Sequence, residues 1–109
     1  YSKIKTAFQV EKGEKLCIVI ALGYGETQGL PHKSKSMEEV IQLDGPAPEW
    51  FQKGVEAALL APTAMNQQKF LFRLDKNRVS VKAGFGFYTK IDMGIVKYHF
   101  EIGSGRKLQ

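Results

Sequence analysis

Residues 61–68 read Ala-Pro-Thr-Ala-Met-Asn-Gln-Gln, and this segment separates a predicted helix from a predicted hairpin. The helix is expected to begin near Pro48, because proline suits a helix first turn, and to run to about Ala61, where Pro62 stops it. Its apolar residues recur at helical spacing. They are Phe51, Val55, Ala58 and Leu59. By itself, the segment has the composition of a helix stop followed by a turn.

Two stretches of alternating polar and apolar residues follow, at 69–74 and 78–82. Alternation is typical of strands, and the three residues between the stretches predict an antiparallel hairpin. One face of the hairpin is expected to be apolar, with residues of the second strand opposite those of the first. These residues are Phe70, Phe72 and Leu74, then Val79 and Val81.

The N-terminal part of the chain predicts a helix end and a buried strand. Residues 1–9 have apolar residues at helical spacing and are interpreted as the end of a helix. Residues 16–22 are apolar throughout, which is typical of a central strand in a sheet. Cys17 lies within this run and is expected to be a small buried hydrophobe.

Two further helices are predicted from their N-terminal residues. Ser36, with Glu39 three residues later, forms a capping box for a short helix at residues 37–42. Asp92 is expected to cap the last helix, and Gly94 to allow close helix packing. The inner face of this helix is assigned by helical spacing. It comprises Ile95, Tyr98 or His99, and Ile102.

Length and composition describe one ordinary globular domain over residues 1–109, with 43% hydrophobic and 25% charged residues. The predicted elements make an α+β fold in which a small antiparallel sheet packs with helices. One cysteine and two histidines without ligand spacing argue against a zinc site, and the lone cysteine favours a cytoplasmic location. No apolar run reaches the length that spans a bilayer.

The formal net charge of +5 attracts anions, which include a phosphorylated cofactor, nucleic acid and acidic lipid. Lys33 and Lys35 flank a serine hydroxyl in a predicted loop, and His32 adjoins them. Lysine binds phosphate as a point charge, and serine adds a hydrogen-bond donor. The loop is therefore either a phosphate clamp or a solvated basic loop.

The side chains of residues 61–68 also suit a flat heteroaromatic edge, because Asn and Gln each carry a donor and an acceptor. The segment resembles the helix end of nitroreductase-like FMN flavoproteins, which reads Ala-Pro-Ser-(Ser/Ala)-x-Asn-x-Gln-Pro-Trp. Thr63 replaces a serine and keeps its hydroxyl, and Lys69-Phe70 replaces Pro-Trp. The resemblance implies FMN contacts for Gln68 and for four other residues of the turn. The four are Pro62, Thr63, Ala64 and Asn66.

The basic loop resembles the same family, whose members end a late strand in Gly-Tyr and follow it with a basic pair that holds the FMN phosphate. Here Gly23-Tyr24 precedes Lys33 and Lys35. Because the 61–68 segment follows this loop, the chain resembles a divergent nitroreductase branch built from two half-repeats. The resemblance implies the C-terminal portion of an FMN-dependent nitroreductase-like fold, either as a homodimer or paired with the upstream half of the same chain.

The function implied by the resemblance is that of an FMN-dependent oxidoreductase. Such a flavoprotein moves electrons from NAD(P)H through FMN to a nitroaromatic or quinone-like acceptor. A second hypothesis is a non-catalytic dimerising or ligand-binding fragment, because the family's upstream flavin motifs do not occur in these residues. RNA recognition by residues 82–90 ranks below both, since the match to the RNA-recognition strand pattern is short. No nucleic-acid or membrane partner is therefore expected.

Overall fold

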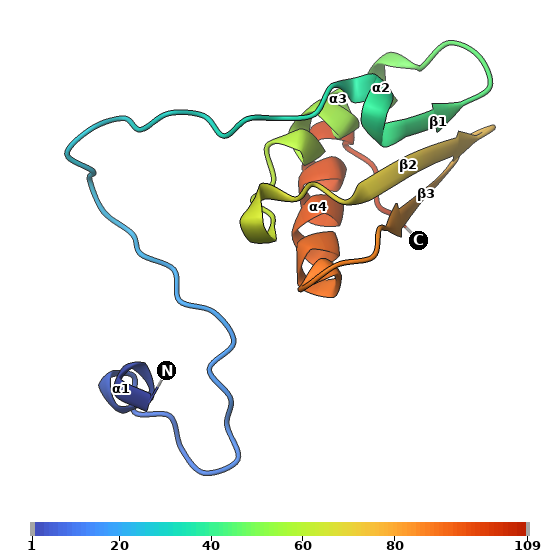
Figure 1. Cartoon of the computed structure of the whole chain (residues 1–109). Coiled ribbons are helices and arrows are strands. Elements are labelled where there is room, and N and C mark those ends of the chain that lie inside the picture. Colours follow the sequence, from blue (N-terminus) through green and yellow to red (C-terminus); the bar gives the residue numbers. More distant parts are fainter. Residues whose placement is uncertain (1, 109) are drawn as a thin grey trace. The chain divides into compact units, whose positions relative to one another are not determined.

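The computed structural model describes residues 2–108, except for the side chains of residues 2, 4 and 5. The chain divides into two compact units, Tyr1–Leu30 and Pro31–Gln109. The first unit begins with helix α1 (Ser2–Ala7), as predicted, and continues through a turn into backbone without helix or strand (Figure 1). None of the described helices combines the length and apolar character that a membrane crossing requires.

The predicted strand at residues 16–22 is wrong. The structure gives these residues no helix or strand, and Ile20 and Leu22 are 76% and 94% exposed. Cys17 is likewise exposed rather than buried, and its thiol lies 3.6 Å from the carbonyl oxygen of Lys15. A continuous apolar run becomes a strand only where a neighbouring strand accepts its backbone hydrogen bonds, and no described strand pairs with residues 16–22.

The second unit contains a three-stranded sheet with the order β1-β2-β3 (Figure 1). The strands are β1 (Ile41–Leu43), β2 (Phe70–Asp75) and β3 (Arg78–Ala83). The β2–β3 hairpin is confirmed, with Phe72 opposite Val81 and Leu74 opposite Val79. Strand β1 runs parallel to β2, so the sheet is mixed rather than wholly antiparallel.

The parallel strand β1 also corrects the predicted extent of the preceding helix. Helix α2 covers only Met37–Val40, although its capping box is present, with the Ser36 N–H donating to Glu39 at 2.8 Å. Ile41 instead begins the strand and pairs with Phe72 of β2. Helix α3 (Glu49–Leu59) follows β1 and returns the chain, so that β2 lies parallel to β1. Residues 41–43 therefore pair with β2 and do not continue α2.

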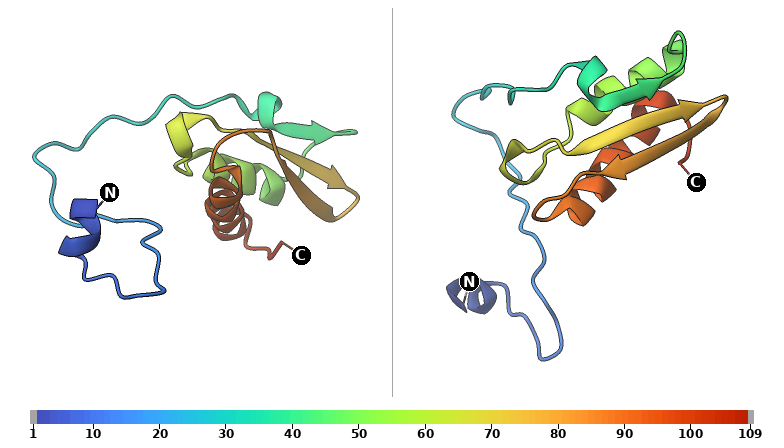
Figure 2. Two further views of the ribbon diagram at one scale, coloured as in Figure 1. Left: turned by 60° about the horizontal axis from the view of Figure 1, so that its bottom comes forward. Right: turned by 45° about the vertical axis from the view of Figure 1, so that its right-hand side comes forward.

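Helices α3 (Glu49–Leu59) and α4 (Thr89–Ser104) pack against each other on one face of the sheet (Figure 2). Phe100 of α4 stacks on Phe72 of β2 with ring centroids 4.7 Å apart. The same ring lies edge-on to Phe51 of α3 at 5.9 Å. All three rings are fully buried, so this aromatic cluster joins the sheet to both helices.

The buried face of helix α4 matches the predicted one only in part, because Ile95 and His99 are half-buried. It begins at Thr89 with Tyr88 as its N-cap residue, so Asp92 lies within the first turn and is not the cap. Ile102, which was assigned to the inner face, is 65% exposed, and Tyr98, the alternative to His99, is 62% exposed. The buried apolar residues of the helix are Met93, Val96 and Phe100. Both sets have helical spacing, and the choice between them follows from the ring cluster that accepts Phe100.

Helices α3 and α4 pack closely at Gly103 of α4. A Cβ atom at Gly103 would lie 2.5 Å from the Cβ of Ala57 and 2.5 Å from the carbonyl oxygen of Lys53. Gly94 was expected to allow such packing, but a Cβ there would meet no atom of the described residues within 4 Å. That expectation was wrong, because Gly94 lies on the exposed face of α4.

We therefore expect Gly103→Ala to lower the free energy of unfolding by about 1–3 kcal/mol, because the added methyl group overlaps α3. Gly94→Ala is the matched control in the same helix. It should leave the free energy of unfolding unchanged or raise it by up to about 1 kcal/mol, since alanine favours a helix over glycine. Urea denaturation of both variants measures these effects, and equal losses would contradict the helix contact.

Candidate functional site

The turn that follows α3 has a left-handed backbone at three residues other than glycine. Helix α3 ends at Leu59, and the short 3-10 helix η1 (Ala64–Asn66) follows after the proline. The φ angles of Met65, Asn66 and Gln68 are 52°, 51° and 44°. Such a backbone costs energy for residues with a side chain and persists only where surrounding contacts hold it. The contacts that hold this turn also define the candidate site.

The basic loop at residues 33–35 lies directly against this turn. Asn66 donates from Nδ2 to the carbonyl oxygen of Lys33 at 2.8 Å. The backbone N–H of Lys35 donates to Oε1 of Gln68 at 2.7 Å, and Lys35 Nζ donates to the Gln68 carbonyl oxygen at 3.0 Å. The fold therefore brings together the two motifs for which FMN contacts were expected from the sequence.

Gln68 is the buried link between the loop, the turn and the end of α3. It is 1% exposed. Its amide Nε2 lies 3.5 Å from the carbonyl oxygen of Leu59 and 3.4 Å from Nδ1 of His32. Ser34 also donates to the Leu59 carbonyl oxygen, at 3.3 Å. Both ends of the Gln68 amide therefore have partners within the protein, and its Oε1 holds the backbone of Lys35 in place.

A second link joins the turn to the start of α4 through Asp92. This carboxylate is 8% exposed. Its Oδ1 accepts the backbone N–H of Ala64 at 3.0 Å, and its Oδ2 accepts Nε2 of Gln67 at 2.6 Å. Gln67 also donates to the carbonyl oxygen of Phe87 at 2.7 Å. The sequence shows Asp92 only as an acidic residue near a helix start, and nothing in the pattern indicates that its partner is a turn 28 residues away.

We expect Asp92→Ala to lower the free energy of unfolding by about 1–3 kcal/mol, because it leaves the Ala64 N–H without its acceptor and removes one of the two acceptors of the Gln67 amide. Asp92→Asn retains one acceptor oxygen and should cost less. Urea denaturation of the two variants measures the difference. A loss for Asp92→Ala that is no larger than the loss for Asp92→Asn would show that these two hydrogen bonds do not stabilise the fold.

The loop and the turn border an open depression of about 260 Å³. Its lining comprises Lys33, Ser34, Lys35, Glu39, Asn66 and Gln68. The two lysines supply positive charge, whereas Glu39 supplies one negative charge at the rim. The backbone N–H of Ser36 lowers the pKa of the Glu39 carboxyl, which is therefore ionised at neutral pH. The depression is thus net basic and has hydroxyl and carboxamide groups beside the charges.

A comparison with known protein families shows which family this chain belongs to. The family model described as "Putative TM nitroreductase" matches residues 1–104. The chain belongs to this family. The match spans both structural units and both halves of the candidate site. Comparisons with curated proteins and with solved structures found no significant match.

Membership of the nitroreductase family agrees with the resemblance of the 61–68 segment and of the basic loop. It supports an oxidoreductase of the flavin-associated kind as the general class of this protein. The described residues form a small α+β arrangement with a three-stranded mixed sheet, which replaces the wholly antiparallel sheet expected from the sequence.

The turn residues expected to meet the cofactor differ in how they are exposed. Pro62 and Asn66 are exposed, whereas Thr63 and Ala64 are half-buried. The hydroxyl oxygen of Thr63 accepts the Gln68 N–H at 3.0 Å, and the Ala64 N–H donates to the buried carboxylate described above. The N–H groups of residues 66 and 67 donate to carbonyl oxygens within the turn. These backbone N–H groups are therefore engaged within the protein, and Nδ2 is the atom of Asn66 that contacts the basic loop.

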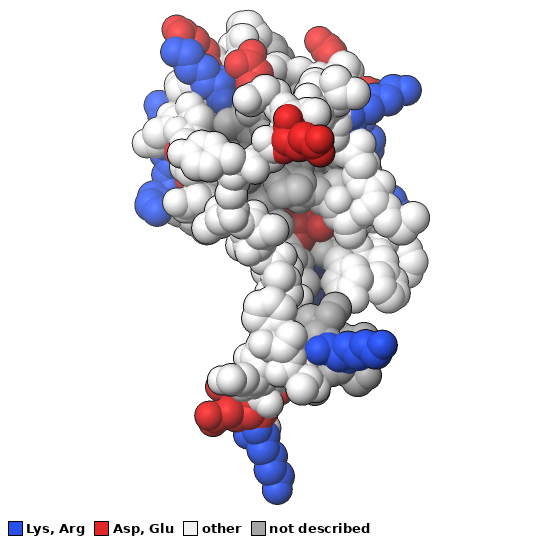
Figure 3. Space-filling view, turned by 90° about the vertical axis from the view of Figure 1, so that its left-hand side faces the viewer, with Lys and Arg blue, Asp and Glu red and all other residues white. Residues whose placement is uncertain are grey.

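The glycine-rich loop at residues 84–88 lacks the geometry of an RNA-recognition strand. Strand β3 ends at Ala83, and Phe85 and Phe87 lie in the following turn, 99% and 75% exposed. RNA-recognition domains stack bases on aromatic residues of the sheet surface. On the face shown in Figure 3, Lys and Arg side chains are also interspersed with Asp and Glu rather than gathered in one basic field.

Proposed function

We propose that this chain contributes the phosphate end and one edge of an FMN site in a nitroreductase-type oxidoreductase. The observation that supports the proposal is the contact between the basic loop and the 61–68 turn. Lys33 and Lys35 belong to the loop, Asn66 and Gln68 belong to the turn, and three hydrogen bonds join these residues. The family match supports the same general class.

The phosphate end would be held by the two lysines. Lys35 is positioned by the Gln68 carbonyl oxygen, which uses one of the three donors of its ammonium group. Lys33 is exposed, and its ammonium group makes no hydrogen bond or salt bridge with another described residue. Both ammonium groups therefore keep donors for the oxygens of a phosphate, which lysine binds as a point charge.

The ring edge would be met by the turn. Because Asn66 donates from Nδ2 to the protein, its Oδ1 is the atom that can accept the ring N–H of a flavin. The Thr63 hydroxyl oxygen accepts a backbone N–H and can still donate its own proton. These two groups suit one polar edge of a flavin, so the described residues fit the phosphate end and an edge of the cofactor.

The other wall of the site would come from a second polypeptide surface. Met65, at the tip of the turn, is 97% exposed, and the depression beside the basic loop is open to solvent. A planar cofactor needs a surface on each side to exclude water. We therefore propose that a second copy of the chain, or the upstream half of the same protein, covers the turn.

Bound FMN would supply the electron transfer from NAD(P)H to a nitroaromatic or quinone-like acceptor. The residues of this chain bind and orient the cofactor. The alternative function is that of a non-catalytic dimerising fragment. Its support is the exposure of apolar side chains around the turn, because Met65 and Phe85 are almost fully exposed.

A visible absorbance spectrum of the complete purified protein, recorded with and without added FMN, tests the proposal. We expect stoichiometric flavin binding and an oxidation of NAD(P)H that depends on FMN. A colourless protein that forms dimers and leaves NAD(P)H unchanged in the presence of FMN would support the non-catalytic alternative. A protein that neither takes up FMN nor dimerises would exclude both functions.

A further inference from the structure

A second basic surface lies at the hairpin end of the sheet. Two neighbouring depressions of about 260 and 310 Å³ share Arg78, Val79 and Leu108 in their linings. The first also includes Trp50 of α3 and Arg106 of the C-terminal segment. The second extends along β3 to Lys97 of α4 and Ser80. We call this surface the hairpin groove and define it by Trp50, Arg78, Lys97, Arg106 and Lys107.

The C-terminal side of the hairpin groove is held in place by several contacts. The Arg106 guanidinium lies over the Trp50 ring, 3.7 Å from the ring centroid. The N–H of Arg106 donates to Oγ of Ser104 at 3.1 Å. The N–H of Leu108 donates to Oε1 of Glu101 at 2.8 Å. These contacts fix the direction of the segment and hold Arg106 at the groove before any ligand arrives.

The cations of the hairpin groove are only partly balanced. Lys107 pairs with Glu101 at 3.4 Å, and Asp75 lies opposite Arg78 in the strand register. Within the described residues, however, neither Arg78 nor Arg106 forms a salt bridge, and no Asp or Glu lines either depression. Arg78 and Arg106 therefore line the depressions, and neither guanidinium group has a hydrogen-bond or ion-pair partner among the described residues.

We propose that the hairpin groove binds a small phosphate-bearing anion through Arg78 and Arg106. Guanidinium groups match phosphate oxygens in paired hydrogen bonds, which a hydrated lysine cannot do. The volume of the depressions suits a small ligand rather than an extended polymer. Val79 and Leu108 provide apolar contacts for an organic group attached to the phosphate.

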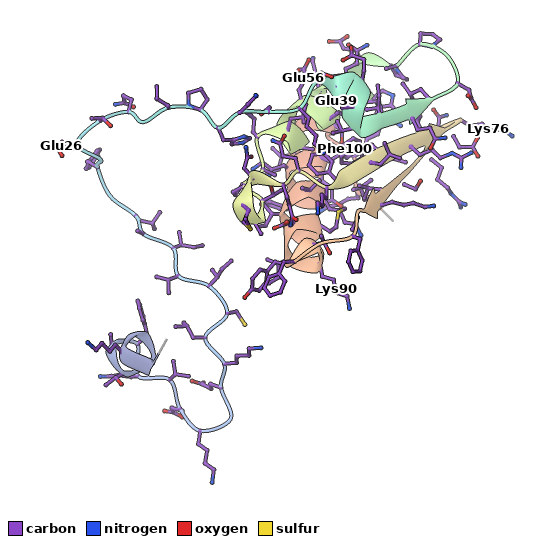
Figure 4. The ribbon with its side chains drawn as sticks, in the orientation of Figure 1. Glu26, Glu39, Glu56, Lys76, Lys90 and Phe100 are labelled. Carbon is purple, nitrogen blue, oxygen red and sulfur yellow. The ribbon has the colours of Figure 1, made fainter. Side chains whose placement is uncertain are left out.

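The hairpin groove is separate from the proposed FMN site. Arg78 pairs with Asp75 at one end of β2, whereas Phe70 at the other end follows the 61–68 turn. These ends are five residue steps apart along the strand, which corresponds to roughly 17 Å. Figure 4 shows Lys76 at the hairpin turn, at the opposite end of the strands from the turn that precedes β2. Failure of FMN binding would therefore leave this proposal untouched.

Trp50 is the only tryptophan of residues 1–109 and lines the hairpin groove, so its fluorescence is a readout of binding there. The experiment titrates the complete protein with inorganic pyrophosphate at low salt and measures tryptophan fluorescence, with calorimetry as a second readout. We expect saturable binding in both. Arg78→Gln should weaken the affinity by about 10-fold or more, because it removes a charge-assisted contact. Arg106→Gln should weaken the affinity by a similar factor. Its affinity is measured by calorimetry, because this substitution itself changes the surroundings of Trp50 and hence the fluorescence.

Two control variants separate a built site from general charge. Lys90→Gln removes one exposed charge at the start of α4. It should change the affinity by less than about 2-fold, because salt screens the interaction of a distant exposed charge with the ligand. Lys33→Gln tests whether pyrophosphate binds at the basic loop of residues 33–35 instead of at the hairpin groove. Absence of saturable binding, equal losses for Arg78→Gln and Lys90→Gln, or loss of the signal in Lys33→Gln would each overturn the proposal.

A second ligand shows what the hairpin groove recognises beyond phosphate. A nucleoside diphosphate carries the same diphosphate group with an organic substituent. If it binds more tightly than pyrophosphate and loses affinity in Arg78→Gln, the substituent lies on the apolar part of the groove. If it binds as tightly as pyrophosphate with the same loss, the groove recognises phosphate alone. Both results require Arg78 and both support the proposed site.

Discussion

Replacement of Phe100 by alanine should lower the free energy of unfolding by about 3–5 kcal/mol, which is the largest effect expected in this protein. Phe100 is fully buried, stacks on Phe72 and lies edge-on to Phe51. A Cβ atom at Gly54 would lie 2.5 Å from the Phe100 ring, so α3 has a glycine where the ring fits. Removal of the ring leaves a cavity bordered by β2, α3 and α4. These elements cannot close the cavity without losing other packing contacts.

Urea denaturation measures this loss, with two further variants for comparison. Phe100→Leu fills part of the cavity and should cost about 1–2 kcal/mol, so it keeps the test informative if Phe100→Ala does not fold. Ile102→Ala changes a residue of the same helix that is 65% exposed and should cost little. If Ile102→Ala proved as costly as Phe100→Ala, the face of α4 that was predicted from the sequence would be the buried one after all.

Replacement of both Lys33 and Lys35 by glutamine should weaken FMN binding by about 100-fold, roughly 10-fold for each lost ammonium contact. The two lysines are the cations of the depression beside the 61–68 turn. Calorimetry, or quenching of flavin fluorescence in the complete protein, measures the affinity. Higher salt should weaken binding to the parent protein and have less effect on the double variant, because the ammonium contacts are screened.

The single variants distinguish direct contact from positioning. Lys33→Gln removes an exposed ammonium group that forms no hydrogen bond or salt bridge with another described residue, so its effect reports the cofactor contact. Lys35→Gln also removes the hydrogen bond to the Gln68 carbonyl oxygen and should lower the thermal midpoint slightly. Lys90→Gln is the control at the start of α4, where its side chain lies away from the strands (Figure 4). An FMN affinity that fell as much in Lys90→Gln as in Lys33→Gln would contradict the proposed phosphate contact.

Several local elements could be predicted because short-range patterns specify them. The capping box of Ser36 and Glu39 acts over three residues, and it is present in the structure. The alternation of the hairpin places Phe72 opposite Val81, since a strand has a side-chain period of two. These features depend on neighbours in the chain and need no knowledge of what packs against them.

The errors occur where a distant partner decides the outcome. The apolar run at residues 16–22 has the composition of a buried strand, but no described strand pairs with it. Ile41 was predicted to continue a helix, although pairing with Phe72 makes it a strand residue. In each case the local sequence permits two structures, and the long-range hydrogen bonds select one of them.

The candidate site shows the same division. The sequence by itself determined that the 61–68 segment is a helix stop and turn, that residues 33–35 are basic, and that both resemble parts of a flavin site. Only the tertiary structure decided that the loop lies on the turn, that Gln68 is buried between them, and that Asp92 holds Gln67. These contacts join residues 25 to 36 positions apart, and such pairings depend on how the helices and strands pack rather than on any pattern within one segment.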